Sequence, residues 1–460
     1  MEGYIVQRIM KAMGVDPVSL DPNIQRAPIT GITTDSRKVN PGEVFFAIRG
    51  ERFDGAEYVK DAAGAGAILS VVNAGRNAGP YASPVAVVEN TVDALGKAAA
   101  DYRSTFAGKV VAITGTSGKT TVKEMLLAIL GRKFRVHGTA GNFNNRIGLP
   151  LTMFGLRESH DCAVFELGMS APGEISELAA MCKPDIGVIL NIGQGHAAFF
   201  DGIESIAEAK MELLPALTSR GTAIINGDDA LLYPAPERTA ARIVRFGLGD
   251  NADYRAEAVE IGTDGCARFT VEGNRVALRV PGSHAVLNAL AAYTAAREMG
   301  MDMDGATAAD ALSAFEAPKL RMQRIVRDGV TCLNDTYNAN PVSMRAAADV
   351  VKQTAARRKI AVLGDMLELG EFSERAHRET GELFARSGIG LLCLVGEFAG
   401  SYAEGAVEGG LARDRVRVFA STAEAAEFLT AEKHPGDLIL VKGSRGMRME
   451  RIIDSLCGGA

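Results

Sequence analysis

The stretch "AITGTSGKTTVKE" (residues 112–124) gives the strongest indication of fold and chemistry in the chain. The common P-loop pattern G-x-x-x-x-G-K-[ST] requires a glycine six residues before the lysine, but Ile113 stands at that distance from Lys119. The buried-strand pattern "KVVAIT" precedes the loop and the helical pattern "VKEMLLAILGRK" follows it. This order directs backbone N–H groups and a helix N-terminus at one anion. We therefore predict a phosphate site in which Lys119 neutralises charge and Thr120 offers its hydroxyl to Mg²⁺; the alternative is an ordinary turn.

The composition is that of a globular protein with several domains. The 460 residues exceed the roughly 100–200 of one domain, and 47% are hydrophobic against 23% charged. A net charge of −6 argues against a nucleic-acid partner, which usually requires a basic surface. Six widely spaced cysteines without a C-x-x-C pair argue against a disulfide framework or a zinc site. No apolar run reaches the ~18 residues of a membrane span, and the first residues lack a signal-peptide pattern, so we expect a cytoplasmic enzyme without membrane contact.

Short apolar stretches that alternate with helical sequence predict an α/β protein of three domains. Such alternation is typical of parallel sheets covered by helices on both faces. The more polar, alternating stretch 253–281 predicts an antiparallel hairpin pair. We expect a small N-terminal α/β domain over residues 1–106, a central P-loop-like parallel-sheet ATPase domain over 107–317, and a C-terminal Rossmann-like doubly wound domain over 318–460.

Further polar residues stand near the ends of the predicted central strands, where open parallel sheets bind their ligands. Glu166 ends "AVFELG" among apolar residues, so its carboxylate belongs either to an ion pair or to a Mg²⁺ site. His196 follows the strand "VILNIG" and is either structural or a ligand. Lys210 falls within the apolar stripe of a predicted helix. Either its aliphatic chain lies along the protein surface so that the ammonium reaches water, or the amine is desolvated, with a lowered pKa, and is available for chemistry.

Several motifs together resemble the Mur ligase family, the ATP-dependent, amide-forming enzymes of bacterial cell-wall synthesis. They are "TGTSGKTT", "GNFNNRIGLPLT", "FELGMSAPGEI", "NIGQGHAAFF", the lysine of "AEAKMELL" and "NDTYNANPVSM". The family's loop pattern, G-T-x-G-K-[ST]-[ST], lacks the distant first glycine, so Ile113 is no departure from it. "YNANPVSM" (337–344), "LGDMLELG" (363–370) and "LVKGSRGMRME" (440–450) resemble the subgroup that adds D-alanyl-D-alanine to UDP-N-acetylmuramoyl-tripeptide.

The resemblance implies a catalytic ATP site with two Mg²⁺ ions in the central domain. In the family, the loop lysine contacts phosphate, the hydroxyl after it binds Mg²⁺, a strand-end carboxylate and a histidine bind the metal ions, and a further lysine is carried as a carbamate that also binds metal. Lys119, Thr120, Glu166, His196 and Lys210 match these positions in turn. The whole nucleotide-binding loop comprises Gly115, Thr116, Ser117, Gly118, Lys119, Thr120 and Thr121.

Three more residues match ATP contacts of the family. Asn288 corresponds to an asparagine on the adenine side, Arg321 to a phosphate contact, and Asp335 to a ribose contact, the last two from the C-terminal domain. From position alone, Asn288 fits a polar residue on a solvated helix face, Arg321 a surface charge, and Asp335 the cap of a turn. The resemblance favours the functional interpretation of all three.

The resemblance also implies how the two substrates bind. The segment "TDSRKVNPGEVFFAIRGERFDGAEY" resembles the uridine-nucleotide-binding domain of the same subgroup. The C-terminal domain is expected to close on ATP and to bind the incoming dipeptide, although the basic loop "KGSRGMR" also fits a solvated turn. The expected substrate contacts are Ser36, Arg37, Asn142, Asn144, Asn145, Lys442, Ser444 and Arg445.

The implied function is ATP-dependent ligation through an acyl phosphate, by an enzyme that the resemblance suggests is a monomer. One alternative is a ligase similar to folylpolyglutamate synthase, in which a uridine-nucleotide domain is not expected. The other is a nucleotide-gated binding protein that hydrolyses ATP to change shape and forms no bond.

Overall fold

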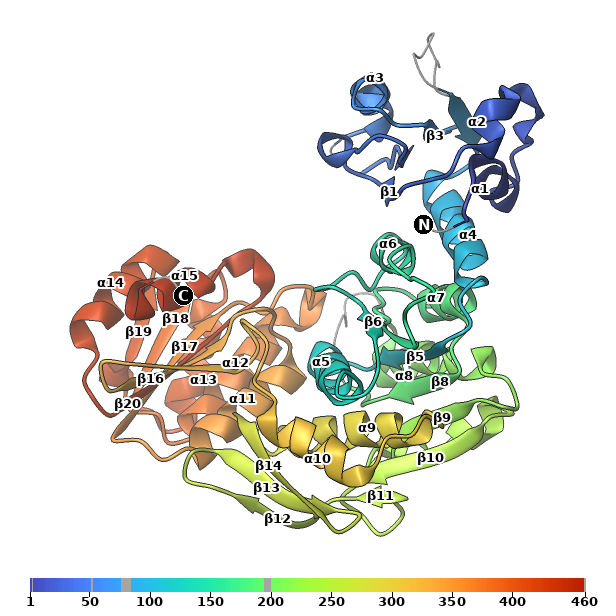
Figure 1. The fold of residues 1–460 in the computed structure, drawn as a ribbon. Coiled ribbons are helices and arrows are strands. Elements are labelled where there is room, and N and C mark those ends of the chain that lie inside the picture. Colours follow the sequence, from blue (N-terminus) through green and yellow to red (C-terminus); the bar gives the residue numbers. More distant parts are fainter. Residues whose placement is uncertain (2, 51–52, 76–83, 194–199, 459–460) are drawn as a thin grey trace.

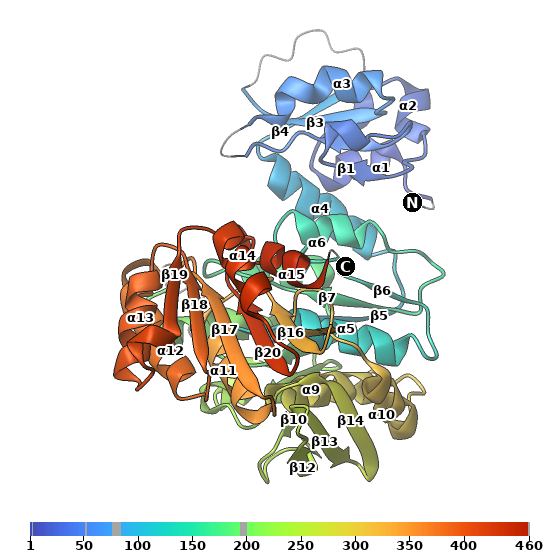
Figure 2. The ribbon, with the colours of Figure 1, turned by 90° about the vertical axis from the view of Figure 1, so that its left-hand side faces the viewer.

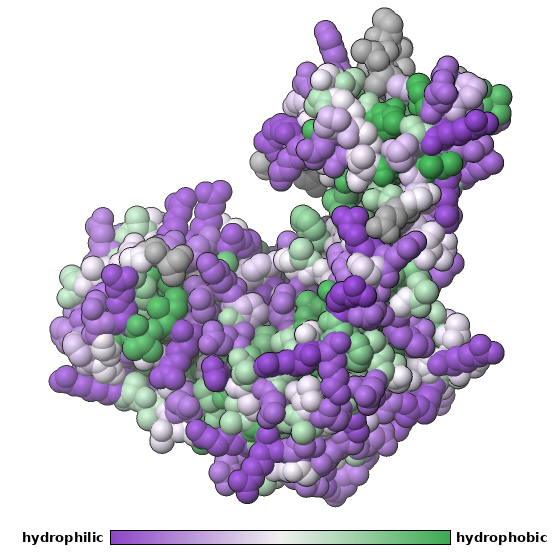
Figure 3. Space-filling model, viewed as in Figure 1, coloured by the Kyte–Doolittle hydropathy of each residue, from purple (hydrophilic) through white to green (hydrophobic). Residues whose placement is uncertain are grey.

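The computed structural model describes residues 1, 3–50, 53–75, 84–193 and 200–458. The chain forms an N-terminal, a central and a C-terminal lobe (Figure 1). The N-terminal lobe stands away from the C-terminal lobe, whereas the central lobe adjoins both of them in two perpendicular views (Figures 1 and 2). The surface is hollowed between the N-terminal and C-terminal lobes (Figure 3). Among the described residues, no helix has the length and apolar character that a membrane crossing requires.

The N-terminal lobe holds a four-stranded sheet whose strands run parallel in the order β1-β2-β3-β4. The strands are short apolar stretches, and every residue of β2 is buried. The small N-terminal α/β fold that the sequence predicts is thereby confirmed. The bounds are β1 Ile32–Thr33, β2 Val44–Phe46, β3 Leu69–Asn73 and β4 Val85–Val88, with helices α1 Val6–Ala12, α2 Pro22–Arg26 and α3 Val59–Gly64.

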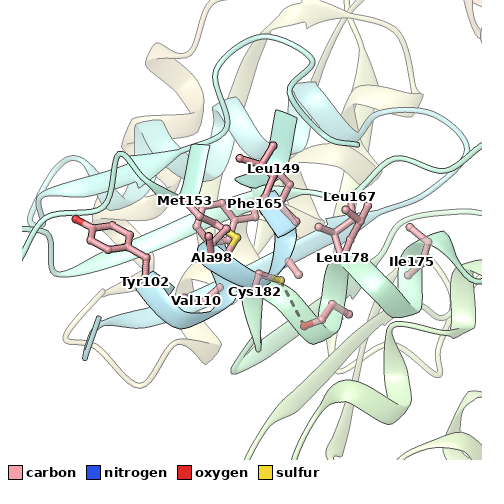
Figure 4. Packing of buried hydrophobic residues seen from close by; sticks show 14 of the residues in the cluster. Ala98, Tyr102, Val110, Leu149, Met153, Phe165, Leu167, Ile175, Leu178 and Cys182 are labelled. Carbon is pink, nitrogen blue, oxygen red and sulfur yellow. Dashed lines mark hydrogen bonds between the residues drawn. The ribbon is translucent and has the colours of Figure 1, made fainter. Parts of the chain in front are cut away.

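Helix α4 (Thr91–Arg103) packs on both the N-terminal and the central lobe. On the N-terminal side, the Tyr4 hydroxyl donates to the carbonyl of Ala98 at 3.2 Å. On the central side, the Tyr102 hydroxyl donates to the carbonyl of Leu156 at 2.8 Å. Ala98 and Tyr102 lie among buried apolar side chains of the central lobe (Figure 4). A packed helix, not a free linker, therefore fixes the N-terminal lobe to the central one.

The central lobe is built on a seven-stranded sheet in the order β11-β10-β9-β8-β5-β7-β6, with every neighbouring pair parallel. Helices α5, α9 and α10 pack on one face, and α4, α6, α7 and α8 on the other. Burial on both faces explains why the strands are continuous apolar stretches. The bounds are β5 Lys109–Thr114, β6 Val136–Gly138, β7 Cys162–Glu166, β8 Ile186–Ile189, β9 Thr222–Asn226, β10 Arg242–Gly247, β11 Tyr254–Arg255, α5 Lys119–Leu130, α6 Gly148–Met153, α7 Glu174–Cys182, α8 Gly202–Met211, α9 His284–Glu298 and α10 Gly305–Ala314.

Most of the stretch 253–281 forms the predicted antiparallel hairpins, but its first strand joins the central sheet. Strand β11, at the start of this stretch, pairs in parallel with β10 and extends the central sheet. The remainder forms a separate three-stranded antiparallel sheet, β12-β13-β14. Its bounds are β12 Glu257–Ile261, β13 Cys266–Val271 and β14 Asn274–Pro281.

The C-terminal lobe confirms the predicted doubly wound architecture. Its six-stranded sheet has the order β15-β16-β20-β17-β18-β19, in which only the edge strand β15 runs antiparallel to its neighbour. Helices α11, α12 and α13 cover one face, and α14 and α15 the other. The bounds are β15 Gln323–Arg327, β16 Val330–Asp335, β17 Arg358–Gly364, β18 Leu391–Val395, β19 Val416–Phe419, β20 Asp437–Lys442, α11 Pro341–Gln353, α12 Ser373–Ala385, α13 Ala399–Glu408, α14 Thr422–Glu432 and α15 Glu450–Cys457.

Helix α11 approaches the central lobe closely at two glycines. A Cβ atom on Gly193 would lie 2.6 Å from the Val342 side chain, and one on Gly282 would lie 2.7 Å from the Val350 side chain. Val342 and Val350 are eight residues apart and so share a face of the helix. The missing side chains at these glycines let the two lobes approach as closely as they do.

Helices α12 and α13 provide a test of this kind of close packing. A Cβ atom on Gly381 would lie 2.0 Å from the carbonyl oxygen of Tyr402, and one on Gly405 would lie 1.9 Å from that of Arg378. We predict that Gly381→Ala and Gly405→Ala each lower the free energy of unfolding of the C-terminal lobe by about 1–3 kcal/mol, measured by urea unfolding of the full chain. Gly400→Ala is the control, because no atom lies within 4 Å of its added Cβ; it should be neutral or stabilising. Equal effects at all three glycines would contradict the packing argument.

Candidate active site

The phosphate loop lies between β5 and α5, at the carboxyl end of the central sheet. Gly118 has a φ of +85°, in the left-handed region where other residues are strained. A Cβ atom at this position would also lie 2.5 Å from Oδ1 of Asn288. Helix α9 therefore places Asn288 directly against the loop, beside the predicted nucleotide site.

Asn191, at the end of β8, holds the phosphate loop through its side chain. Its Oδ1 accepts the N–H of Ser117 at 3.0 Å, and its Nδ2 donates to the carbonyl of Ser117 at 3.1 Å. Its backbone carbonyl accepts the N–H of Thr116 at 3.1 Å. The shape of the loop is thus fixed by protein contacts. Sequence motifs alone did not single out Asn191, although its place at a strand end, on the same edge as the loop, was an available signal.

Lys119 begins helix α5 and folds back over the loop. Its Nζ donates to the carbonyl of Gly115 at 2.6 Å. Burial lowers the pKa of Lys119, the nearby Glu166 carboxylate opposes this effect, and the charge of Arg321 lowers the pKa further. The ammonium group therefore lies in a partly desolvated place where an anion would be strongly attracted.

Glu166 forms the acidic side of the site. Its side chain is almost fully buried, with Oε2 accepting the hydroxyl of Thr120 at 2.7 Å and Oε1 accepting the amide of Asn144 at 2.6 Å. These oxygens fit Mg²⁺, which prefers oxygen ligands and keeps several waters. Across the described ranges, no three or more His, Cys, Asp or Glu side chains gather as a metal site. Glu166 and Thr120 are the residues that would hold such an ion.

Lys210 is buried on helix α8, with 3% of its surface exposed. The alternative of a side chain that extends to the surface is therefore wrong. Burial lowers the pKa of its amine well below the usual value, and the charge of Lys119 adds to this effect. His196, the other predicted metal ligand, lies outside the described residues.

The C-terminal lobe contributes Arg321 and Tyr337 to the same region. The guanidinium of Arg321 stacks on the ring of Tyr337, 3.9 Å from its centroid. Burial raises the pKa of Tyr337, the charge of Arg321 lowers it, and the carboxylate of Glu166 raises it again. Arg321 thus lies close enough to Lys119, and Tyr337 close enough to Glu166, for their charges to interact across the two lobes.

The other predicted residues of the C-terminal lobe have protein partners. Lys442 donates to the carboxylate of Asp335 at 2.5 Å. Ser444 has 2% of its surface exposed, and its hydroxyl accepts a backbone N–H at 2.9 Å. Arg445 is exposed and pairs with Glu450 at 3.2 Å. Contacts of these residues with ATP or with a dipeptide remain predictions.

The remaining predicted substrate residues lie in two places. Ser36 and Arg37 belong to the N-terminal lobe, where Arg37 bonds to Asp35 at 2.8 Å and holds the pKa of that carboxyl at about 2. Asn142 and Asn145 lie in the loop before α6 and are exposed. The side-chain oxygen of Asn145 accepts a backbone N–H at the start of α6 at 2.9 Å. Neither the pair in the N-terminal lobe nor the two asparagines belong to the phosphate loop, residues 115–121.

Comparison with known proteins identifies the family. The description "Mur ligase middle domain" matches residues 113–296, "Mur ligase, glutamate ligase domain" matches 320–445, and "Mur ligase family, catalytic domain" matches 28–103. The UDP-N-acetylmuramoyl-tripeptide–D-alanyl-D-alanine ligase of Bacillus subtilis (strain 168) is 37% identical over 445 residues, covering 95% of each chain. The chain belongs to the Mur ligase family.

Two solved structures share the fold of this Mur ligase. MurF from Acinetobacter baumannii has a TM-score of 0.88 at 32% identity, covering 99% of this chain and 98% of that chain. MurF ligase from Thermotoga maritima, in complex with ADP, has a TM-score of 0.81 at 28% identity, covering 93% and 96% respectively. This Mur ligase is thus an ATP-dependent enzyme that forms an amide bond.

Lys119 and Glu166 are the residues whose loss should most damage this Mur ligase. We predict that Lys119→Ala and Glu166→Ala each lower kcat/KM by at least about a hundredfold, because Lys119 supplies positive charge to the phosphates and Glu166 is the carboxylate that would hold Mg²⁺ there. Steady-state release of ADP and phosphate measures the effect. The control is Lys109→Ala at the start of β5, where the exposed lysine pairs with Asp185 at 3.3 Å. Near-normal ATP-dependent ligation in either active-site variant would contradict the assignment.

Proposed function

We propose that this enzyme joins D-alanyl-D-alanine to UDP-N-acetylmuramoyl-tripeptide with the energy of ATP, in the synthesis of peptidoglycan precursors. The observation that carries the proposal is the fixed phosphate loop with Lys119, faced by Glu166 from the same sheet edge and by Arg321 from the C-terminal lobe. The similarity to the Bacillus subtilis ligase over 95% of both chains supports the choice of substrates.

The reaction begins with a carboxylate, which is a poor electrophile until it is activated. ATP transfers its γ-phosphoryl group to the terminal carboxylate of the tripeptide, and the amine of the dipeptide then displaces phosphate from the resulting acyl phosphate. Lys119 and the N–H groups at the start of α5 bind the phosphates, and Arg321 adds positive charge from the other side. Bound at Glu166 and Thr120, Mg²⁺ would neutralise further phosphate charge.

The lobes divide the substrates between them in this proposal. Residues 1–106, with Ser36 and Arg37, bind the uridine nucleotide, and residues 107–317 bind ATP. Residues 318–460 close on ATP and receive the dipeptide. The enzyme acts as a cytoplasmic monomer.

We further propose that Lys210 carries a carbamate in the active form of the enzyme. A neutral amine adds CO₂ and gains oxygen atoms that suit Mg²⁺. Its burial and lowered pKa support this chemistry, because a buried lysine is more readily neutral.

The substrate assignment predicts a strict stoichiometry. ATP, UDP-N-acetylmuramoyl-tripeptide and D-alanyl-D-alanine should give ADP, phosphate and one new amide in equal amounts, measured by coupled assay and mass spectrometry. Omission of the dipeptide is the control and should abolish the amide. ATP hydrolysis without an amide would favour a nucleotide-gated binding protein. Ligation of glutamate to a folate would favour the folylpolyglutamate synthase alternative.

The carbamate predicts a direct spectroscopic signal. With ¹³C-labelled bicarbonate, the enzyme should show a carbamate carbon resonance that Lys210→Met lacks. Lys210→Met should also lose activity, whereas Lys210→Glu, which restores a carboxylate, should retain more of it. A labelled enzyme without this resonance but with full activity would exclude the carbamate.

A further inference from the structure

The segment that carries Arg321 into the active site has an unusual backbone. Leu320 and Met322, on either side of Arg321, have φ angles of +65° and +52°. Residues with a Cβ atom adopt this left-handed conformation at a cost and keep it only when surrounding contacts enforce it. The turn between the central and C-terminal lobes therefore needs a support.

The end of strand β16 provides this support. The N–H of Met322 donates to Oδ1 of Asp335 at 3.0 Å. The N–H of Tyr337 donates to the carbonyl of Leu320 at 3.1 Å. Both strained residues are thus held by the segment 335–337, and the ring of Tyr337 also lies beneath the Arg321 guanidinium.

Lys442 holds that segment in turn. It lies opposite Asp335 in the register of β16 and β20. Its Nζ donates to Oδ2 of Asp335 at 2.5 Å and to the carbonyl of Asn338 at 2.9 Å. Only 1% of its surface is exposed, so these protein oxygens, and not solvent, surround its charge. One oxygen of Asp335 serves Lys442 and the other serves the strained turn.

We propose that Lys442 is a positioning residue that fixes Arg321 toward the ATP phosphates through Asp335, and that it does not contact the dipeptide. The inference rests on the proposed function only in that Arg321 meets the phosphates of ATP. Loss of Lys442 leaves the carboxylate of Asp335, which has 16% of its side chain exposed, without its ion-pair partner, and this is costly. The carboxylate then shifts toward water, the turn at Leu320 and Met322 loses its acceptor, and Arg321 loses its fixed direction.

The test measures nucleotide affinity in four forms of the full chain: the natural protein, Lys442→Met, Arg321→Ala and the double variant. Isothermal titration with ADP and with a non-hydrolysable ATP analogue gives Kd without any ligation. We expect each single variant to weaken binding of the ATP analogue at least about fivefold, and the double variant to be no weaker than Arg321→Ala, because the two residues act as one unit. The control is Lys359→Met on the neighbouring strand β17, whose amine donates to the carbonyl of Lys352 at 3.0 Å; its Kd should not change.

Steady-state kinetics then separates the two possible roles of Lys442. A positioning role raises KM for ATP or lowers kcat and leaves KM for D-alanyl-D-alanine unchanged. A rise in KM for the dipeptide with unchanged nucleotide Kd would overturn the inference, as would fully multiplicative losses in the double variant or an unchanged Kd in Arg321→Ala. Thermal unfolding checks each variant, and Lys442→Gln, which keeps an N–H donor, replaces a Lys442→Met that does not fold. If the natural protein forms no amide, the proposed substrates fail, while the nucleotide titrations still decide the role of Lys442.

Discussion

Two anions, a carboxylate and the γ-phosphate of ATP, must meet for this reaction, and their repulsion is the constraint on which the structure depends. The described part of the site answers this repulsion with the positive charges of Lys119 and Arg321, which lie opposite the carboxylate of Glu166. The charges of Lys119 and Arg321 are close enough to disfavour one another. Two positive charges held this close repel each other in the free enzyme, and a bound phosphate stabilises both of them. The site is therefore preorganised for the anion before it binds.

The fold supplies this cluster from separate elements. Strands β5, β7 and β8 are neighbours in a parallel sheet, so the phosphate loop, Glu166 and Asn191 emerge at one edge. Arg321 comes from outside this sheet, and helix α11 can bring its lobe close only because Gly193 and Gly282 have no side chains. The central sheet thus supplies Lys119 and Glu166, and the C-terminal lobe adds the positive charge of Arg321.

Sequence patterns predicted the parts of the site that are local in the chain. Lys119 and Thr120 follow a recognisable strand, and Glu166 ends another, so their common edge could be inferred. The strand-end position of Asn191 also indicates this edge, but its partner Ser117 is 74 residues away, so the sequence does not indicate that its side chain holds the loop. The basic loop that begins at Lys442 predicts a dipeptide contact. The burial of Lys442 follows from the pairing of β16 with β20, across 107 residues. The sequence contains no local trace of that register.

The turn at residues 320–322 illustrates how backbone strain can fix a side chain. A turn made of glycines would let the C-terminal lobe approach in many orientations, and Arg321 would lose conformational entropy each time it met the phosphates. Leu320 and Met322 have side chains, so few backbone conformations satisfy both of them. Once Asp335 and Tyr337 hold the strained form, the direction of Arg321 is largely set before ATP binds. The strain therefore costs stability in the free turn. Because Arg321 is already positioned, less of the binding energy of ATP is used to order it, and more is available to lower the barrier of the reaction.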